Sequence, residues 1–512
     1  MVRPVVFVVA CRAVTGCVLF LLTLAGRPLA AELPAAEVAV GPGTAAGHAV
    51  AVPESFLGLS QEWPWVPSLT LSPHATSIIG RLRNDNGPLM LRVGGTSYDA
   101  GHDRVHRGDG PAERMQREGV AKALPALQSL RDSLGMRFIL TLSLACRDPG
   151  LVQRQADDWR RSLGDAVVAF EIGNEPNYYK DILRDRWPDD GSGRFYRDLV
   201  TEFAACCEQL DGFPLAGPAW GWIGLRPDMM ERYLQAAPRP LTAVTVHYYH
   251  SAYDARPSRG RPNDTPESLL DDTHTREVMK NWIGPQLAVA RRHGVPLRIT
   301  ECNSISGGGN VGVSDVYAAA LWSLDTALEM AAAGVAGIDF HQASRKYAIY
   351  ERITGGPDTG DGNPPPLYHS YRVQPPFYGL LCFQQAVTAG SRIAALPHGG
   401  PRSLKVYAVE AGHESRTVIV NKSPREPCRI AVHVPANAAD HATLTRLVAP
   451  GNSITARRGI RLAGVNYDDW GGRPDGEPVV EKVSAAPGAD GGLVYRVRLP
   501  PASAAILRAG AP

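Results

Sequence analysis

Two glutamates directly follow apolar runs that predict buried strands, and their positions allow acid–base and nucleophilic chemistry. Glu175 comes just after Val167–Ile172 and precedes a proline, and Glu301 follows Leu297–Thr300. Two carboxyl groups about 5 Å apart can cleave a glycosidic bond with retention, because one protonates the leaving oxygen while the other attacks the anomeric carbon. We interpret Glu175 and Glu301 as a candidate pair of catalytic carboxyl groups for such a reaction.

The residues around these glutamates indicate further contacts with a substrate. Asn174 precedes Glu175 and can hydrogen-bond a sugar hydroxyl, whereas Glu171 lies within the strand and is expected to be structural. Gly307–Gly309 offer successive N–H groups without side chains, which can hold an anion, although a flexible loop is the alternative interpretation. His250 and His341 are assigned no role. Four tryptophans beyond two predicted strands could stack on sugars or belong to the core: Trp63, Trp65, Trp220 and Trp222.

The elements that position these residues alternate along the chain. Eight apolar runs predict strands that are buried on both faces, as in a parallel sheet. They are Phe56–Ser60, Leu89–Val93, Phe138–Leu142, Val167–Ile172, Pro214–Gly217, Leu241–Tyr248, Leu297–Thr300 and Gly337–Phe340. Predicted helices separate them, at Glu113–Leu134, Arg194–Leu210, Arg276–His293 and, with Ser314 as N-cap and Gly334 as stop, Asp315–Ala333. This alternation favours an α/β fold, a (β/α)₈ TIM barrel, over a doubly wound open sheet.

The sequence pattern changes after Gly390, where short strand patterns alternate with turns rich in proline and glycine. We expect a catalytic barrel over residues 55–390 and a C-terminal β-sandwich domain over residues 391–512. Residues 32–54 carry two further strand patterns, Glu37–Val40 and Ala49–Val52, which are expected to pair with the sandwich.

Charge and cysteine spacing exclude several classes of function. The 53 basic and 51 acidic residues leave a net charge of +2, so neither nucleic acid nor an anionic membrane is expected as a partner. No Cys/His spacing suggests a metal site, and no cofactor is expected. Residues 1–31 resemble a signal peptide cleaved near Ala31, which predicts a secreted or periplasmic protein without a membrane anchor. The oligomeric state is left open.

Several motifs together resemble glycoside hydrolase family 79, the β-glucuronidase and heparanase family. The asparagine–glutamate–proline motif at Glu175 is common to a large clan of barrel glycosidases, whereas Glu301 followed by the glycine run Gly307–Gly309 is more specific. The resemblance continues through Gly58–Glu62, Leu91–Thr96, Val313–Asp315, Leu321–Asp325 and Gly337–His341. Cys302 departs from the family, in which many members carry threonine after the nucleophile.

The resemblance implies roles for individual residues. Glu175 corresponds to the family's acid/base and Glu301 to its nucleophile, and Asn174 to the residue that contacts the sugar 2-hydroxyl. The remaining correspondences concern substrate binding. Glu62 corresponds to a residue that binds distal hydroxyls, and His247 and Tyr249 correspond to residues beside the nucleophile. Gly307 and Gly308 correspond to donors of N–H groups to a glucuronate carboxylate, and Tyr347, or Tyr350 within one turn of it, to a residue that binds the same carboxylate.

The predicted activity is exo-cleavage of β-linked glucuronic acid from glycans or glycoconjugates, with a glucuronide-containing carbohydrate as partner. An endo-acting, heparanase-like β-glucuronidase is one alternative, although its long sulfated substrates favour a strongly basic cleft. Another retaining glycosidase, such as an arabinofuranosidase or xylosidase, would leave the glycine run unexplained. An inactive carbohydrate-binding protein is the alternative from a different class, and the presence of both glutamates argues against it.

Overall fold

The computed structural model describes residues 35–40, 49–83, 87–102, 104, 108–222, 224, 226–251, 264–342, 346–353, 370–412, 414–436, 438–468, 470–489 and 491–509. The expected signal peptide, residues 1–31, lies outside this part of the chain. Within it, no helix has both the length and the apolar character that crossing a membrane requires.

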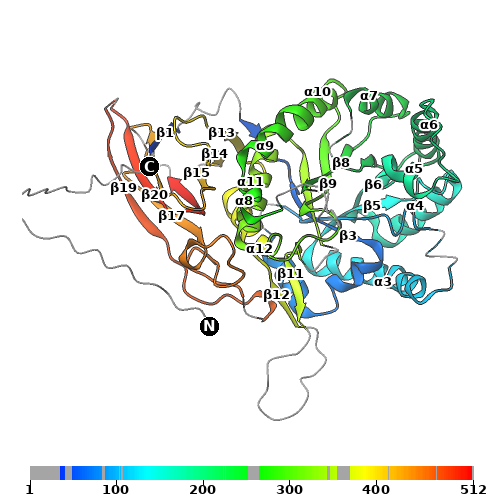
Figure 1. The fold of residues 1–512 in the computed structure, drawn as a ribbon, viewed down its shortest axis with the longest axis horizontal. Helices are drawn as coiled ribbons and strands as arrows, with labels where there is room; N and C mark the ends of the chain where they lie inside the picture. Colours follow the sequence, from blue (N-terminus) through cyan, green and yellow to red (C-terminus); the bar gives the residue numbers. More distant parts are fainter. Residues whose placement is uncertain are drawn as a thin grey trace, which may run out of the picture. The chain divides into compact units, whose positions relative to one another are not determined.

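Parallel strands close into a barrel in the order β10-β3-β4-β5-β6-β7-β8-β9 (Figure 1). Closure occurs where β10 pairs with β3, with Ile338 opposite Leu57. The predicted barrel fold is therefore confirmed. The strands are β3 (Leu57–Glu62), β4 (Met90–Gly94), β5 (Arg137–Leu142), β6 (Val167–Ile172), β7 (Leu215–Trp220), β8 (Ala243–Ser251), β9 (Leu297–Ile305) and β10 (Gly337–His341).

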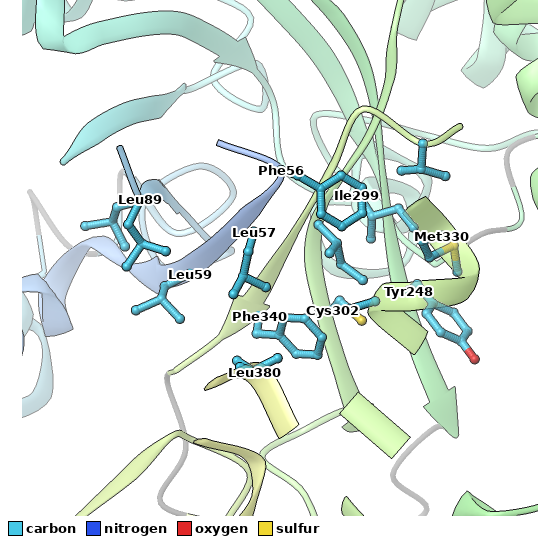
Figure 2. Packing of buried hydrophobic residues seen from close by; sticks show 14 of the residues in the cluster. Phe56, Leu57, Leu59, Leu89, Tyr248, Ile299, Cys302, Met330, Phe340 and Leu380 are labelled. Carbon is cyan, nitrogen blue, oxygen red and sulfur yellow. The ribbon is translucent and has the colours of Figure 1, made fainter. Parts of the chain in front are cut away.

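The barrel strands bury side chains on both faces, and each face meets a different part of the core. Residues such as Leu57, Leu59, Ile299 and Phe340 belong to the large core that also includes the surrounding helices, and Figure 2 shows them packed together. A second, smaller cluster takes one residue from each of five consecutive strands: Met90, Ile139, Ala169, Ala216 and Ala243. Such a layer of inward-pointing side chains fills a barrel and leaves no pore.

Helices surround the barrel, and several of them bury one stripe of side chains. In α6 (Arg194–Gln209) the buried stripe runs through Phe195, Leu199, Phe203 and Cys206. The other long helices are α3 (Pro111–Leu134), α4 (Pro149–Leu163), α7 (Pro227–Ala236), α10 (Gly284–Arg292), α11 (Tyr317–Ala333) and α12 (Pro375–Ala386). The predicted helix Arg276–His293 is divided into α9 (Asp272–Val278), a π-helical turn over Met279–Ile283, and α10.

Helix α11 differs from its prediction at its start and in its burial. Its N-cap is Val316, so the prediction of Ser314 as N-cap is wrong. The Ser314 hydroxyl instead accepts a hydrogen bond from the backbone N–H of Asn310 at 3.1 Å. The helix is buried on nearly all sides, because α12 and the C-terminal strands also pack against it (Figure 1). It ends at Gly334, which has the predicted left-handed conformation with φ 89°.

A second sheet contains the C-terminal strands and the segment that precedes the barrel. Its order is β1-β16-β20-β19-β17-β21-β15-β14-β13-β2, and β18 pairs with β17. The strands are β1 (Ala35–Ala39), β2 (Val50–Ala51), β13 (Arg392–Ala395), β14 (Leu404–Ala411), β15 (Glu414–Asn421), β16 (Cys428–Val434), β17 (His441–Val448), β18 (Arg461–Leu462), β19 (Glu481–Pro487), β20 (Leu493–Leu499) and β21 (Ser503–Ala509). Residues from both ends of this order share one core, including Val38, Val406, Val432 and Leu507, so the sheet folds over into a sandwich.

Candidate active site

The carboxyl ends of the barrel strands carry the residues that the sequence predicted for the site. This end is where active sites form in barrel enzymes. Glu62 ends β3, Asn174 and Glu175 follow β6, His247 and Tyr249 lie in β8, Glu301 lies in β9, Gly307 and Gly308 follow β9, and Tyr347 follows β10.

Glu301 is buried and has partners on both carboxylate oxygens. The Tyr249 hydroxyl donates to Oε1 at 2.6 Å, and the Arg92 guanidinium donates to Oε2 at 3.0 Å. The Nδ1 atoms of His247 and His341 each lie 3.9 Å from Oε2. Burial alone would raise the pKa of Glu301, but His341, His247, Arg92 and the Tyr249 hydrogen bond lower it to about 2. The arrangement holds Glu301 as the anion that a nucleophile must be.

Glu175 has fewer partners and remains open to solvent. Its side chain is 24% exposed, and Oε1 is hydrogen-bonded to His247 Nδ1 at 3.0 Å. Its backbone has a φ of 51°, in the left-handed region, and its N–H donates to the Ala219 carbonyl at 2.8 Å. A non-glycine residue in this conformation stores strain, which is common at functional sites. The strained turn directs Glu175 to His247, which links the two glutamates.

The separation between the two carboxylates fits a retaining mechanism. Glu175, His247 and Glu301 each place one polar side-chain atom within 4.8 Å of the other two. Retaining glycosidases hold their carboxyl groups about 5–5.5 Å apart, whereas inverting enzymes hold them about 6.5–9.5 Å apart. The geometry therefore supports direct attack by Glu301 over activation of an intervening water.

Glu175, His247 and Glu301 also have the spacing of metal ligands, so the charges around them bear on whether they could bind a metal ion. The Arg92 cation lies 3.0 Å from the Glu301 oxygen, and it would repel a metal ion bound there. His247 already uses Nδ1 toward Glu175. The absence of a metal stays a prediction that chelation can test.

Arg92 is a central residue of the site that the sequence reasoning did not single out. Its guanidinium contacts Glu301, and it also donates to Glu171 Oε2 at 2.7 Å and to Asn174 Oδ1 at 2.7 Å. Glu171, expected to be structural, is fully buried and also accepts from Thr300 at 2.7 Å. Arg92 therefore fixes Glu301 and Asn174 relative to each other. A charged residue inside the apolar run Leu89–Val93 was the available signal.

Asn174 is oriented by polar groups from a neighbouring loop. Its backbone N–H donates to Asp99 Oδ2 at 2.7 Å, and its side-chain Nδ2 donates to Thr96 Oγ1 at 3.3 Å. Asp99 is buried and also accepts from the Tyr179 hydroxyl. Burial raises the pKa of Asp99 to about 6, although these hydrogen bonds oppose the shift.

Glu62, at the end of β3, lies close to Asn174, because Gly95 lies against both side chains. It accepts from the backbone N–H of Ser97 at 3.3 Å and from the Ser97 hydroxyl. Burial raises its pKa to about 7, and the charge of Glu301 contributes. Gly95 has a φ of 103°, and a Cβ there would collide with the Glu62 carboxyl group, so this loop requires glycine. Glu62 can thus present a protonated or ionised carboxyl group to a sugar hydroxyl.

The glycine run forms a turn that only residues without side chains adopt easily. Gly307, Gly308 and Gly309 have φ values of 65°, 104° and 79°. A Cβ on Gly309 would lie 2.8 Å from Ser314 Oγ and 3.1 Å from Tyr347 Cδ1. Ser314 also accepts from the Ser304 hydroxyl at 2.9 Å. The bare Gly309 therefore lets Ser314 and Tyr347 close on the turn from two sides.

Tyr347 lies at the site, and Tyr350 lies elsewhere. The Tyr347 ring centroid is 6.3 Å from that of Tyr249 and 6.2 Å from that of His341, and both are neighbours of Glu301. Tyr350 belongs to β11 (Tyr350–Ile353), and its ring packs 5.1 Å from Tyr371 of β12 (Ser370–Val373). The geometry favours Tyr347 over Tyr350.

The four tryptophans divide into two pairs. Trp63 and Trp220 are buried and belong to the core. Trp65 and Trp222 are 43% and 44% exposed, on the loops after β3 and β7. Stacking on a sugar is therefore open to the second pair alone.

No family model matches the chain, but its sequence and fold are similar to known glycosidases. It is 23% identical to a β-glucuronidase of Aspergillus niger over 377 residues, which cover 67% of each protein. Its fold is similar to that of a 4-O-α-L-rhamnosyl-β-D-glucuronidase from Fusarium oxysporum, with a TM-score of 0.71, 17% identity, and 92% of this chain and 99% of that chain covered.

A family 51 arabinofuranosidase from Xanthomonas axonopodis pv. citri has a TM-score of 0.61 and 14% identity, with 93% of this chain and 99% of that chain covered. The barrel with its C-terminal sheet domain is therefore a glycosidase fold. The similarity to the Aspergillus enzyme bears out the resemblance to glycoside hydrolase family 79.

Proposed function

We propose that this chain, which resembles glycoside hydrolase family 79, is a retaining exo-β-glucuronidase that releases terminal β-linked glucuronic acid from glycans or glycoconjugates. The observation that carries the proposal is the pair of carboxylates within 4.8 Å of each other, beside a turn of three glycines that can hold an anion. The similarity to a curated β-glucuronidase supports the same activity.

The two glutamates have complementary roles in the reaction. Glu175 protonates the glycosidic oxygen as Glu301 attacks the anomeric carbon, which gives a covalent glycosyl-enzyme. Formation of that ester removes the charge of Glu301, so Glu175 can next take a proton from water. The water then attacks the anomeric carbon and releases glucuronic acid with the β configuration retained. Tyr249 and Arg92, which bind Glu301, orient the nucleophile for attack.

The substrate carboxylate is assigned to the glycine turn. Backbone N–H groups of Gly307 and Gly308, assisted by the Tyr347 hydroxyl, donate to it, and Glu62 and Asn174 bind ring hydroxyls. A hydrogen bond to a charged group contributes about 1.5–3 kcal/mol, which corresponds to roughly 10–150-fold in kcat/KM. These contacts distinguish glucuronides from neutral sugars.

An arabinofuranosidase shares the fold, so the fold does not distinguish a β-glucuronidase from an arabinofuranosidase. The two activities differ in the substrate that the site binds. An arabinofuranoside has no carboxylate, so this alternative gives the glycine turn and Tyr347 no role in substrate binding. The proposal includes export, with residues 1–31 as a cleaved signal peptide and a secreted or periplasmic location.

A panel of aryl glycosides tests the proposal. The kcat/KM for a p-nitrophenyl β-glucuronide should exceed that for the corresponding glucoside, xyloside and arabinofuranoside by at least about 10-fold. Tyr347→Phe should lower the glucuronide value roughly 10–150-fold and affect the glucoside much less. Gly308→Val should be more severe, because its side chain blocks the approach of the carboxylate. Preference for a neutral glycoside would reject the glucuronidase and leave a barrel glycosidase of another specificity.

A further inference from the structure

The loops that follow β6 and β7 carry two large aromatic side chains that remain open to solvent. Tyr178, which lies shortly after Glu175, is 40% exposed, and Trp222 is 44% exposed. Single exposed aromatics are common on soluble proteins and need no explanation. These two lie on adjacent loops, since β6 and β7 are neighbours in the barrel.

The backbone of Gly221 shows how closely Tyr178 approaches the acid/base. A Cβ on Gly221 would lie 2.5 Å from Tyr178 Cε2 and 3.0 Å from Glu175 Cβ. The phenol ring and the Glu175 side chain therefore flank the same point of the β7 loop. In agreement, burial raises the pKa of Tyr178, and the charge of Glu175 contributes to the shift.

Hydrogen bonds fix the two loops to each other. The Gly221 N–H donates to Asn177 Oδ1 at 2.7 Å, and Asn177 Nδ2 donates to the Gly221 carbonyl at 3.3 Å. Both bonds join Asn177, the neighbour of Tyr178, to the start of the β7 loop, so protein groups alone hold the two loops together. A preorganised surface loses less conformational entropy on binding.

Trp222 extends this surface. Its φ of 58° lies in the left-handed region, which costs free energy for a residue with a side chain. Its ring centroid is 6.3 Å from that of Trp282, with 35° between the ring planes. A strained backbone thus holds a large aromatic ring at the surface, where it gains little from burial.

We propose that Tyr178 and Trp222 form the subsite for the leaving group, and that this group presents a ring with an apolar face, either a pyranose or an aryl ring. The inference rests on the proposed glycosidase function and adds the class of leaving group. The proton of the acid/base goes to the glycosidic oxygen, so the group attached to that oxygen has to lie beside Glu175. Aromatic side chains bind the apolar face of such a ring by stacking and by excluding water.

The test compares substrates that differ in the leaving group alone. Methyl β-glucuronide has no ring there, phenyl β-glucuronide has an aryl ring, and a β-glucuronosyl galactoside has a pyranose. In Trp222→Ala and Tyr178→Ala, the ratio of kcat/KM for a ring-bearing substrate to that for the methyl glycoside should fall roughly 10-fold. Trp222→Phe should recover most of the ratio, because it keeps a ring.

Trp65→Ala is the matched control. Trp65 is equally exposed, but it follows β3, which lies four strands from β7 in either direction around the closed barrel. The ratio should not change in this variant. A merely structural role of Trp222 would lower kcat for all three substrates alike, whereas loss of a subsite raises KM for the ring-bearing substrates.

The outcomes separate the subsite from the proposed function. A lower ratio for the phenyl substrate alone assigns an aryl leaving group, a lower ratio for the disaccharide alone assigns a sugar, and an unchanged ratio for both overturns the subsite. The ratio can be measured with any glycone, so activity on xylosides but not on glucuronides would reject the glucuronidase and still test the subsite.

A readout without turnover completes the test. Phenyl β-galactoside, which carries both kinds of ring, should change the tryptophan fluorescence of the wild-type protein and not that of Trp222→Ala, and methyl β-galactoside should do the same where the leaving group is a sugar. No change in the wild-type protein at millimolar concentrations of either compound would overturn the subsite.

Discussion

Two clusters of buried charges differ in how their carboxylates are balanced. In the interdomain cluster, between the barrel helices and the sandwich, the buried cations Lys405 and Lys422 and the exposed Arg276 face the carboxylates Asp272, Asp325 and Glu329. Lys422 lies 2.6 Å from Asp325, and Lys405 lies 2.9 Å from Asp272 and also contacts Glu329. Each carboxylate in this cluster has a permanent cation.

The mouth cluster, at the carboxyl ends of the barrel strands, has fewer permanent cations than carboxylates. Arg92 is shared between Glu171 and Glu301, whereas Glu175 contacts His247 and Glu62 contacts Ser97. Histidines and hydroxyls can change their protonation or rotate, and lysines and arginines in ion pairs cannot do so near neutral pH. The balanced cluster is suited to holding two domains together, and the unbalanced one to moving protons.

The largest expected effect of breaking the mouth cluster comes from Glu301→Gln. Loss of the nucleophile should lower kcat by more than about 10⁴-fold, because catalysis then relies on binding and acid help alone. Azide should attack from the vacated face and give the α-glycosyl azide, which NMR of the product identifies. A β-azide would mean that the roles of the two glutamates are reversed.

Glu175→Gln should have a smaller effect, which depends on the leaving group. General acid catalysis contributes about 10²–10⁴-fold and matters least for a good leaving group. The loss should therefore be larger for methyl β-glucuronide than for p-nitrophenyl β-glucuronide. Azide should accelerate the variant and form the β-azide, and equal losses for both substrates would contradict the assignment.

In the interdomain cluster, Lys422→Met should affect stability and leave kcat/KM unchanged. It leaves the buried Asp325 without its nearest cation, which costs about 3–5 kcal/mol of the free energy of unfolding. Urea denaturation of the protein measures this loss. Lys422→Met combined with Asp325→Leu should recover most of it, because an apolar pair replaces the ion pair. A change below about 1 kcal/mol in the single variant would show that the pair is dispensable.

The smallest effect concerns the pH dependence contributed by Glu62. Its folded pKa of about 7 lies above the ordinary value of 4.5, so the folded state binds a proton more tightly than the unfolded state. This group therefore lowers the free energy of unfolding as pH rises from about 4.5 to 7. Glu301 behaves in the opposite way, and its contribution is lost as pH falls from 4.5 through about 2.

Glu62→Gln should thus become more stable relative to the wild type between pH 4.5 and 7, and the difference should then level off. Urea midpoints at pH 4.5, 6 and 8 measure this trend. A difference that stays constant across these values would show that Glu62 does not titrate in this range.

The sequence predicts the location of a site residue well when that location follows from the position of the residue along a strand. It predicts the location poorly when the residue is defined by a partner that is distant in the sequence. The sequence could predict that Glu175 and Glu301 lie close together, because parallel strands end at one edge of the barrel and both glutamates lie at such ends. Arg92 could not be assigned, because its partners Glu171 and Glu301 lie on β6 and β9 and meet it only after closure. Similarly, Arg298 and Asp339 pair at 2.5 Å across β9 and β10.

A local sequence signal also gave a wrong prediction where a polar side chain binds a partner other than the expected one. Ser314 precedes a helical pattern and has the chemistry of an N-cap, yet its hydroxyl serves the glycine turn through Asn310. Strand β19 has no clear signal in the sequence, because its residues are mostly exposed or half-buried and form no apolar run. Strand β21 also has a weak signal in the sequence, because it contains several alanines, which have weak β propensity. In the structure it is buried between its neighbouring strands β17 and β15.

Trapping of the glycosyl-enzyme tests the central claim most directly. A 2-deoxy-2-fluoro-β-glucuronyl fluoride should react with the protein and form a stable ester, because fluorine at C2 slows hydrolysis of the intermediate. Mass spectrometry of the digested protein should place one 2-fluoroglucuronyl group on Glu301, and the corresponding 2-fluoroglucosyl reagent should label far more slowly. A label on another residue, or faster labelling by the glucosyl reagent, would contradict the account.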